Sequence, residues 1–196
     1  MNLDKKIFFE QYKNTIDPDR KLSQQEVNAI NVFIDMVEQS WNKLSLKQWA
    51  YVFATTFHET AHTFLPVKEA YWMSEDWRKK NLRYWPYFGR GFCQCTWLDN
   101  YKYYSKILNV DLVKNPDLAL NPKYAFEIMI HGFINGTFSK RKVNGKYVPN
   151  KISDFINSEK TDYVNARKCI NLLDKAKLIA NYANTFEKIL QKSFNM

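Results

Sequence analysis

Residues 49–64 limit most strongly what this chain can fold into, because they are apolar on nearly every side of a helix. The side chains that cover the circumference are Ala50, Val52, Phe53, Ala54, Phe57 and Ala61. A helix that is apolar all round is normally buried. The sequence therefore predicts a central buried helix that begins near Ser45 and is ended by Pro66.

Further patterns indicate that most of the chain is helical. Ser23 and Glu26 form a capping box ahead of an apolar run at helical spacing. The other expected helices span residues 99–108, 122–136, 162–170 and 175–190. Residues 67–96 are aromatic, contain glycine and proline and lack a helical period, so they predict a loop with short strands. Residues 139–150 predict an exposed loop.

The chain is long enough for one core, since 45% of its 196 residues are hydrophobic and 16% are aromatic. No repeat or long linker divides it. We therefore predict a single domain over residues 1–196, mainly α (α+β) in class, and we expect a monomer.

The three cysteines do not predict a disulfide framework. Cys93 and Cys95 stand two apart on an expected extended run, where their side chains would point the same way without the reach of a bridge. We expect reduced thiols and synthesis in the cytoplasm. Because the first residues lack the apolar core of a signal peptide and no apolar span of eighteen residues occurs, we expect no stable membrane insertion.

The formal net charge of +9 is clustered along the chain. One group comprises Arg78, Lys79, Lys80 and Arg83, and an acid-free stretch contains Lys140, Arg141, Lys142, Lys146 and Lys151. Such clusters favour a polyanion, such as an anionic bacterial cell wall or a nucleic acid. A solvated lysine-rich face without a partner is the simpler alternative. We predict no nucleic-acid partner, because no zinc-finger spacing, basic heptad helix or aromatic RNA-binding motif accompanies the charge.

A carboxylate falls near the C-terminal end of the predicted central helix. Partial desolvation raises the pKa of a carboxyl group, and the negative end of the helix dipole acts in the same direction. Glu59 is therefore a candidate proton donor near neutral pH. The alternative is a glutamate in a salt bridge to a lysine at the rim of the core.

Histidines on either side of this glutamate permit a different interpretation. The run His58-Glu59-Thr60-Ala61-His62 matches the zinc-peptidase motif, in which two histidines one helical turn apart bind the metal and the glutamate is the base. A third ligand is not evident, because Leu65 and Lys68 stand where the extended motif needs glycine and histidine. Glu75 could serve only if a second helix presented it. We therefore expect no metal.

Glycoside hydrolysis instead needs two carboxyl groups on either side of a sugar, one protonated and one ionised. Glu69 lies ten residues beyond Glu59, and a proline turn between them could bring it back across a groove. Glu75 and Asp76 come next along the chain. In an inverting enzyme the two carboxyl groups stand about 6.5–9.5 Å apart, with a water molecule between them.

That water molecule also needs a residue to hold it. If the run after Gly89-Arg90-Gly91 is extended, Gln94 and Thr96 lie on one face of it, and the Thr96 hydroxyl could bind the water. The plain alternative for the two glycines is an ordinary turn.

Several runs of residues together match the pattern of a known family. They are His58-Glu59-Thr60, Pro66-Val67-Lys68-Glu69, Tyr87-Phe88-Gly89-Arg90-Gly91-Phe92-Cys93-Gln94-Cys95-Thr96-Trp97, Asp99-Asn100-Tyr101, residues 110–120 and residues 162–171. The chain resembles family 19 glycoside hydrolases, the chitinase-like members of the lysozyme superfamily, and specifically the endolysin-type proteins of phages and prophages. The resemblance implies a lysozyme-like helical fold with a small β-hairpin lobe. It also implies inverting cleavage of β-1,4 bonds between N-acetylated sugars, without metal or other cofactor.

The resemblance also implies roles for individual residues. Glu59 would be the general acid, Glu69 the base with Glu75 in reserve, and Thr96 would help to hold the attacking water. The residues implied to bind substrate are His58, Tyr87, Arg90, Gln94, Trp97, Asn100 and Asn171. His58 would orient the acid, and the aromatic side chains Tyr71 and Trp72 could stack on sugar faces.

Three positions depart from the family pattern. The loop between the two carboxylates is shorter than in plant chitinases, Cys95 replaces a leucine, and Asn171-Leu172-Leu173 replaces asparagine-glycine-glycine. On charge we favour peptidoglycan over chitin as the polysaccharide, with action on the cell wall after release or by a non-classical export route. A non-catalytic wall-binding module is a further alternative. For the acid we expect Glu59→Gln to abolish turnover and to leave the melting temperature unchanged or higher.

Overall fold

The computed structural model describes residues 2–16 and 21–194. The α-helices are α1 (Lys5–Thr15), α2 (Gln24–Gln39), α3 (Leu46–Glu59), α4 (Glu75–Asn81), α5 (Leu98–Leu108), α6 (Pro122–Asn135), α7 (Tyr163–Ala166) and α8 (Ala176–Ser193). Short 3-10 helices are η1 (Trp41–Lys43), η2 (Pro116–Leu120), η3 (Ile152–Asp154) and η4 (Arg167–Cys169). Two antiparallel strand pairs, β1 (Val67–Lys68) with β2 (Arg90–Gly91) and β3 (Lys140–Val143) with β4 (Lys146–Pro149), complete the fold.

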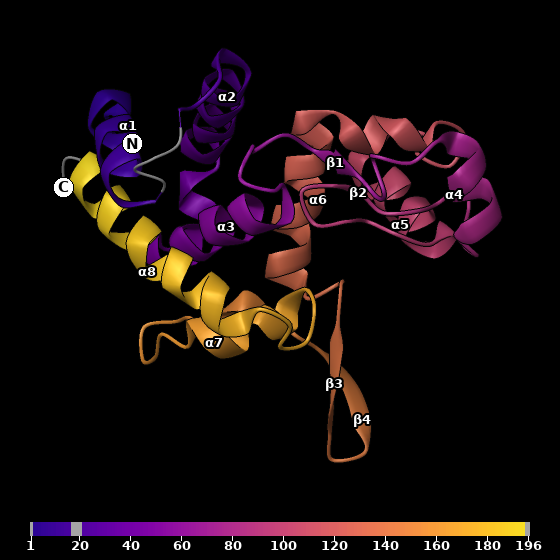
Figure 1. The fold of residues 1–196 in the computed structure, drawn as a ribbon. Helices are drawn as coiled ribbons and strands as arrows, with labels where there is room; N and C mark the ends of the chain where they lie inside the picture. The colour runs from indigo at the N-terminus through magenta and orange to yellow at the C-terminus, as the bar shows by residue number, and fades with distance from the viewer. Residues whose placement is uncertain (1, 17–20, 195–196) are drawn as a thin grey trace.

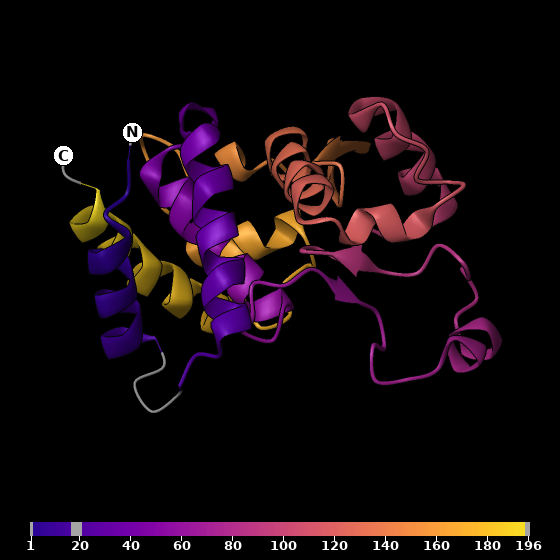
Figure 2. The ribbon, with the colours of Figure 1, turned by 90° about the horizontal axis from the view of Figure 1, so that it is seen from above.

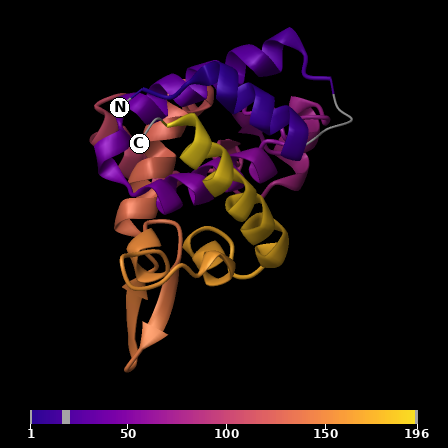
Figure 3. The ribbon, with the colours of Figure 1, turned by 90° about the vertical axis from the view of Figure 1, so that its left-hand side faces the viewer.

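Helix α3 is the centre of the molecule, as its sequence predicts. Ser45 caps its first turn, and every side chain from Trp49 to Phe57 is buried. Helix α8 packs along α3 through the most extensive contact between any two elements of the described structure, and α1 lies against α8 (Figure 1). Figures 2 and 3 show the first described residues beside the end of α8, where Leu3 and Phe194 form a β-bridge.

The end of α3 differs from the sequence prediction. The helix stops at Glu59 instead of continuing to the turn before Pro66, because the chain reverses at Thr60. The Thr60 hydroxyl donates to the Thr56 carbonyl (2.7 Å) and accepts from the Phe64 amide (2.9 Å), and Phe64 has a positive φ of 57°. This reversal turns the Phe64 ring back into the core, where it is 1% exposed. The apolar pattern continues past the helix end because the loop, too, buries side chains.

The other expected helices are present, with small changes. The capping box of Ser23 and Glu26 begins α2, and α5, α6 and α8 fall within three residues of their predicted ends. The predicted helix over residues 162–170 is divided into α7 and η4. The predicted loop over residues 67–96 does contain the short strands β1 and β2, but it also contains helix α4, which the sequence analysis missed.

Two predictions of local backbone shape were wrong. Residues 92–94 form a turn rather than an extended run, because Gly91 and Gln94 both have positive φ angles and Cys95 pairs back with Arg90. Residues 140–149 form a regular β-hairpin rather than an open loop. Its turn is Asn144-Gly145, with φ angles of 49° and 80°, and an Asn-Gly pair is a strong signal for such a turn.

The cysteines agree with the prediction of reduced thiols. Cys93, Cys95 and Cys169 are free and buried. Across residues 2–16 and 21–194, none of the helices combines the length and the apolar composition that crossing a bilayer requires.

Candidate active site

A groove with a volume of about 690 Å³ runs between the end of α3 and the β1 segment. Its walls contain both predicted catalytic carboxylates, Glu59 and Glu69, together with His58 and Gln94. The exposed rings of Tyr71 and Trp72 line it as well; they are 64% and 70% exposed, respectively. The structure therefore brings together residues that the sequence separates by up to 36 positions.

Glu59 forms an ion pair with a buried arginine. Arg167 donates from Nη1 to Glu59 Oε1 (2.6 Å) and from Nε to the backbone carbonyl of Asp174 (2.9 Å). The Arg167 side chain is 2% exposed, and that of Glu59 is 19% exposed. The sequence analysis allowed a salt bridge here but expected lysine. Arg167 lies on the apolar face of the predicted helix over residues 162–170, with Tyr163, Ala166 and Ile170. An arginine at such a position indicates a buried side chain that needs an acidic partner, and this was the signal that could have identified it.

His58 lies beside this ion pair and is half-buried. Burial lowers the pKa of His58 below its ordinary value of 6.5, the Glu59 carboxylate raises it, and the Arg167 guanidinium lowers it again. The net effect is a histidine that stays neutral to lower pH than usual. A neutral imidazole in the wall of the groove can both donate and accept hydrogen bonds.

The geometry that zinc binding requires is missing at this site. Because α3 ends at Glu59 and His62 has a positive φ of 73°, His62 does not follow His58 on the same helical face. The His62 ring stacks on Phe57 instead, with 3.9 Å between ring centroids. No cluster of three or more metal-binding side chains occurs within the described residues. The two histidines are therefore not arranged as the zinc-peptidase interpretation needs.

Glu69 is fixed by hydrogen bonds to both carboxylate oxygens. The Tyr84 hydroxyl donates to Oε1 (2.6 Å), and the Gly89 amide donates to Oε2 (2.8 Å). The Glu69 amide in turn donates to the Gly89 carbonyl (2.8 Å), which extends the β1–β2 pairing by one step. A Cβ atom at position 89 would lie 2.5 Å from Gln94 Oε1, so a larger residue there would displace the Gln94 side chain.

Glu75, the reserve candidate for the base, lies elsewhere. It begins α4, where it accepts hydrogen bonds from Arg78 Nε (3.1 Å) and Trp85 Nε1 (3.1 Å). Burial alone would raise the pKa of Glu75, but the hydrogen bonds from Trp85 and Arg78 outweigh it, so the pKa lies below its ordinary value. Of the two candidates, Glu69 is the one in the groove wall.

Gln94 and Thr96 do not share a strand face, contrary to the prediction, because residues 92–94 form a turn. The two residues are instead connected by a hydrogen bond. Gln94 Nε2 donates to the Val67 carbonyl (3.0 Å), which ties the turn to β1. The Thr96 hydroxyl donates to the Gln94 carbonyl (2.8 Å). Its oxygen still has lone pairs with which it can accept a hydrogen bond from water.

Arg90, which was predicted to bind substrate, is buried and holds the loop together. Its side chain is 4% exposed; Nε donates to Asp117 Oδ1 (2.7 Å), and Nη1 donates to the Tyr101 hydroxyl (3.0 Å) and to two backbone carbonyls. Asp117 also pairs with Lys68 of β1 (3.0 Å). Burial would raise the pKa of Asp117, but the hydrogen bonds from Lys68 and Arg90 lower it overall. The arginine thus fixes the β1–β2 pair that carries Glu69.

The remaining predicted binding residues lie outside the groove wall. Tyr87 packs against Tyr101, with 5.3 Å between ring centroids. Asn100 Nδ2 donates to the Thr96 carbonyl (2.7 Å). Trp97 is 45% exposed and packs against Tyr84. Asn171 is exposed in the loop that follows η4.

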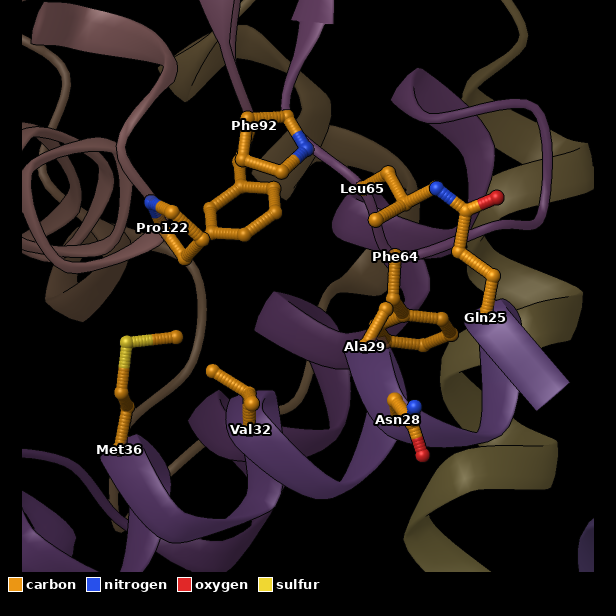
Figure 4. Close-up of a pocket in the computed structure, with 10 residues that line it drawn as sticks. Gln25, Asn28, Ala29, Val32, Met36, Phe64, Leu65, Phe92 and Pro122 are labelled. Carbon is orange, nitrogen blue, oxygen red and sulfur yellow. The ribbon is translucent and has the colours of Figure 1, made fainter.

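A second hollow of about 400 Å³ adjoins the groove, since Leu65 and Pro66 line both. Figure 4 shows Val32 and Met36 of α2 on one side of it and Phe92 and Pro122 on the other. Its lining is apolar apart from Gln25 and Asn28, and it contains no carboxylate. It therefore offers none of the acid–base chemistry of the groove.

Comparison with known proteins supports the interpretation of this fold. The chain matches no protein-family model. It is 33% identical over 116 residues to a basic endochitinase of Brassica napus and 30% identical over 116 residues to an endochitinase of Arabidopsis thaliana. These matches cover 56% of this chain but only 41% and 42% of the plant proteins, so the chain spans about two fifths of their length.

Among solved structures, the fold is similar to that of a mutant of chitinase C, with a TM-score of 0.55, 17% identity, and coverage of 96% of this chain and 76% of that one. Chitinase C from Streptomyces griseus gives a TM-score of 0.51 at 15% identity, with coverage of 95% and 69%. These findings confirm the predicted mainly α, lysozyme-like fold. The sequence matches also confirm the resemblance to chitinases. The finer prediction of a phage-type endolysin stays a prediction.

Proposed function

We propose that the protein is a glycoside hydrolase that cleaves β-1,4 bonds between N-acetylated amino sugars. The observation that carries this proposal is the groove in which Glu59 and Glu69 line the wall from two different segments. Two carboxyl groups across a sugar-sized groove are what glycoside hydrolysis needs. The relatives named as endochitinases support the same class of reaction.

In this mechanism Glu59 is the general acid. Arg167 pairs with Oε1 of the ionised carboxylate, so Oε2 is the oxygen that takes up a proton before turnover and passes it to the substrate. Protonation of the glycosidic oxygen by this group allows the bond to break. Arg167 acts through Glu59 as a positioning residue, because its buried guanidinium fixes the direction of the carboxyl group at the end of α3.

Glu69 is the general base that activates a water molecule. Both of its oxygens accept hydrogen bonds, as the oxygens of an ionised carboxylate do. Gln94 would contact the sugar from the groove wall. Thr96 is not among the residues that line the groove, so its contact with the same water stays a prediction from sequence. Attack by this water on the face opposite the departing sugar inverts the anomeric centre.

For the substrate we propose peptidoglycan, with lysis of bacterial cell walls as the outcome and with phage-type endolysins as the comparison. The support is the net charge of +9, which an anionic wall attracts. Chitin is the alternative, and the names of the relatives favour it. We further propose that the protein is made in the cytoplasm and reaches the wall after release.

The first experiment digests purified peptidoglycan and chitin oligosaccharides in excess EDTA and measures new reducing ends against new free amines. We expect reducing ends in the presence of chelator, and we expect Glu59→Gln and Glu69→Gln each to lower turnover by at least about a hundredfold. Glu75→Gln is the matched control and should stay within a few-fold of the wild type. New amines that disappear with EDTA would refute the glycosidase proposal. Loss of turnover in Glu75→Gln but not in Glu69→Gln would move the base to Glu75.

A further inference from the structure

The β3–β4 hairpin is a basic arm that projects from the helical body, away from the β1–β2 lobe that carries the groove (Figures 1 and 3). In its register Lys142 lies opposite Tyr147, and Lys140 lies opposite Pro149. Residues two apart on a strand, and residues directly opposite, share a face. Lys140, Lys142 and Tyr147 therefore form one row, and Lys146, opposite Val143, lies on the other face next to the turn. Tyr147 is 72% exposed.

The base of this arm is built into the fold. Arg141, on the other face, donates to Asp154 Oδ2 (2.7 Å) and to Asn150 Oδ1 (2.8 Å). Asn150 is 2% exposed and donates to Ser139 Oγ (2.9 Å). Burial would raise the pKa of Asp154, but hydrogen bonds from Arg141 and the Lys151 amide lower it, which agrees with a stable ion pair. The arm is thus anchored at its base and solvated at its tip.

The charges on the arm are not neutralised by the body. Arg141 is paired with Asp154, whereas Lys140, Lys142 and Lys146 are exposed and form no ion pair with any carboxylate in residues 2–16 and 21–194. A folded chain that needed only a solvated face would not have to gather these lysines on a projecting hairpin with an exposed aromatic ring. Such an arrangement fits a ligand that is an extended polyanion.

We propose that the β3–β4 hairpin is a second binding site, separate from the groove, for an anionic wall polymer with repeating phosphate groups. This inference rests on the proposed action on cell walls. Lysine ammonium groups are compact donors that bind phosphate as point charges, and the Tyr147 ring offers an apolar face to the carbon atoms between phosphates. The arm does not offer an arginine for base-specific binding of nucleic acid, because Arg141 is paired with Asp154.

The test compares two triple variants of the full chain. Lys140→Gln/Lys142→Gln/Lys146→Gln removes three charges from the arm. The control, Lys102→Gln/Lys106→Gln/Lys114→Gln, removes three exposed charges from the region of α5. Binding is measured by co-sedimentation with intact walls and with walls from which the phosphate polymer has been extracted, over a range of salt.

We expect the wild type and the control to bind intact walls at least about tenfold more tightly than extracted walls. The arm variant should bind the two kinds of wall equally. A plot of its log affinity against log salt concentration should be less steep than that of the wild type by about 2, because three phosphate contacts are lost. Equal binding of the two triple variants to intact walls would overturn the proposal. So would wild-type binding that is indifferent to extraction. Arm-dependent binding to double-stranded DNA as tight as that to intact walls would identify nucleic acid as the partner and would also overturn it.

Turnover of a short, neutral amino-sugar oligosaccharide separates this inference from the proposed function. Such a substrate occupies the groove without reaching the arm, so both triple variants should cleave it as the wild type does. If the wild type binds walls through the arm but cleaves no oligosaccharide, the glycosidase proposal fails and the arm proposal stands. If all three proteins cleave the oligosaccharide but bind walls equally, the arm proposal fails alone.

Discussion

The ion pair between Glu59 and Arg167 determines how Glu59→Gln will affect stability. In the variant the glutamine carbonyl oxygen can still accept a hydrogen bond from Arg167, but the charge that compensates a guanidinium with 2% exposure is gone. Removal of one partner from a fully buried ion pair costs about 3–5 kcal/mol. Since Glu59 is 19% exposed and one hydrogen bond is retained, we expect a loss of about 1–3 kcal/mol in the free energy of unfolding.

This loss corresponds to a lower melting temperature. For a chain of this length each kcal/mol shifts the melting temperature by about 2–4 °C, so Glu59→Gln should melt about 2–12 °C below the wild type. The structure thus reverses the expectation from sequence that the melting temperature would be unchanged or higher. That expectation treated the carboxylate as a desolvated group without a cationic partner.

Urea unfolding of four proteins measures the interaction directly. They are the wild type, Glu59→Gln, Arg167→Met and the double variant. Because the double variant removes both charges, it should lose less free energy of unfolding than the two single variants lose together. The difference, which is the coupling energy, should be about 1–3 kcal/mol. Glu127→Gln, which breaks the exposed pair with Lys43, is the control and should cost less than about 1 kcal/mol. A wild-type melting temperature in Glu59→Gln, together with zero coupling, would refute the reasoning.

Two further predictions concern Glu69, the proposed base, and the histidines. Tyr84→Phe removes a donor to Glu69 Oε1 (2.6 Å), so kcat should fall about ten- to a hundredfold with little change in KM; an unchanged kcat would show that Tyr84 does not position the base. Burial lowers the pKa values of His58 and His131 below 6.5, against the opposing effects of Glu59 and Glu127, so below pH 6.5 the unfolded chain binds more protons than the folded one. The free energy of unfolding should therefore fall as pH drops from 7 to 5, by at most about 1.4 kcal/mol per pH unit for each histidine. Urea unfolding measured at each pH should show that the free energy of unfolding depends less steeply on pH in His58→Gln/His131→Gln than in the wild type. An unchanged pH dependence in that variant would contradict the lowered pKa values of the two histidines.

The parts of the fold that could be predicted from sequence are those fixed by local signals. The capping box at Ser23 and the start of α3 at Ser45 depend on side chains that bond to amides three residues away, so they can be read from a short window. Glu59 was found for the same reason, since its place at the end of an apolar helix is a local property.

The parts that were missed depend on contacts between distant residues or on signals that were overlooked. Arg167 reaches Glu59 across 108 positions of sequence, and spacing alone could not pair them. The hairpin turn at Asn144-Gly145 carried a recognisable local signal that the abundance of lysine obscured. Helix α4 was missed because the segment around it is rich in aromatic residues and lacks a helical period. Its local signals were the N-cap Ser74 and the acidic Glu75 and Asp76, which interact favourably with the helix dipole.

The two carboxylates of the groove are held by different means. Glu59 ends a helix that the whole core surrounds, whereas Glu69 follows a strand pair of two residues each, which could not fix a side chain without further support. That support comes from Arg90, whose contacts with Asp117 and Tyr101 join the glycine-rich turn to η2. The runs Gly89-Arg90-Gly91 and Asn115-Pro116-Asp117-Leu118 therefore form one structural unit, although 27 positions separate Arg90 from Asp117. Together they hold Glu69, the proposed base, in the wall of the groove that Glu59, fixed by the core, also lines.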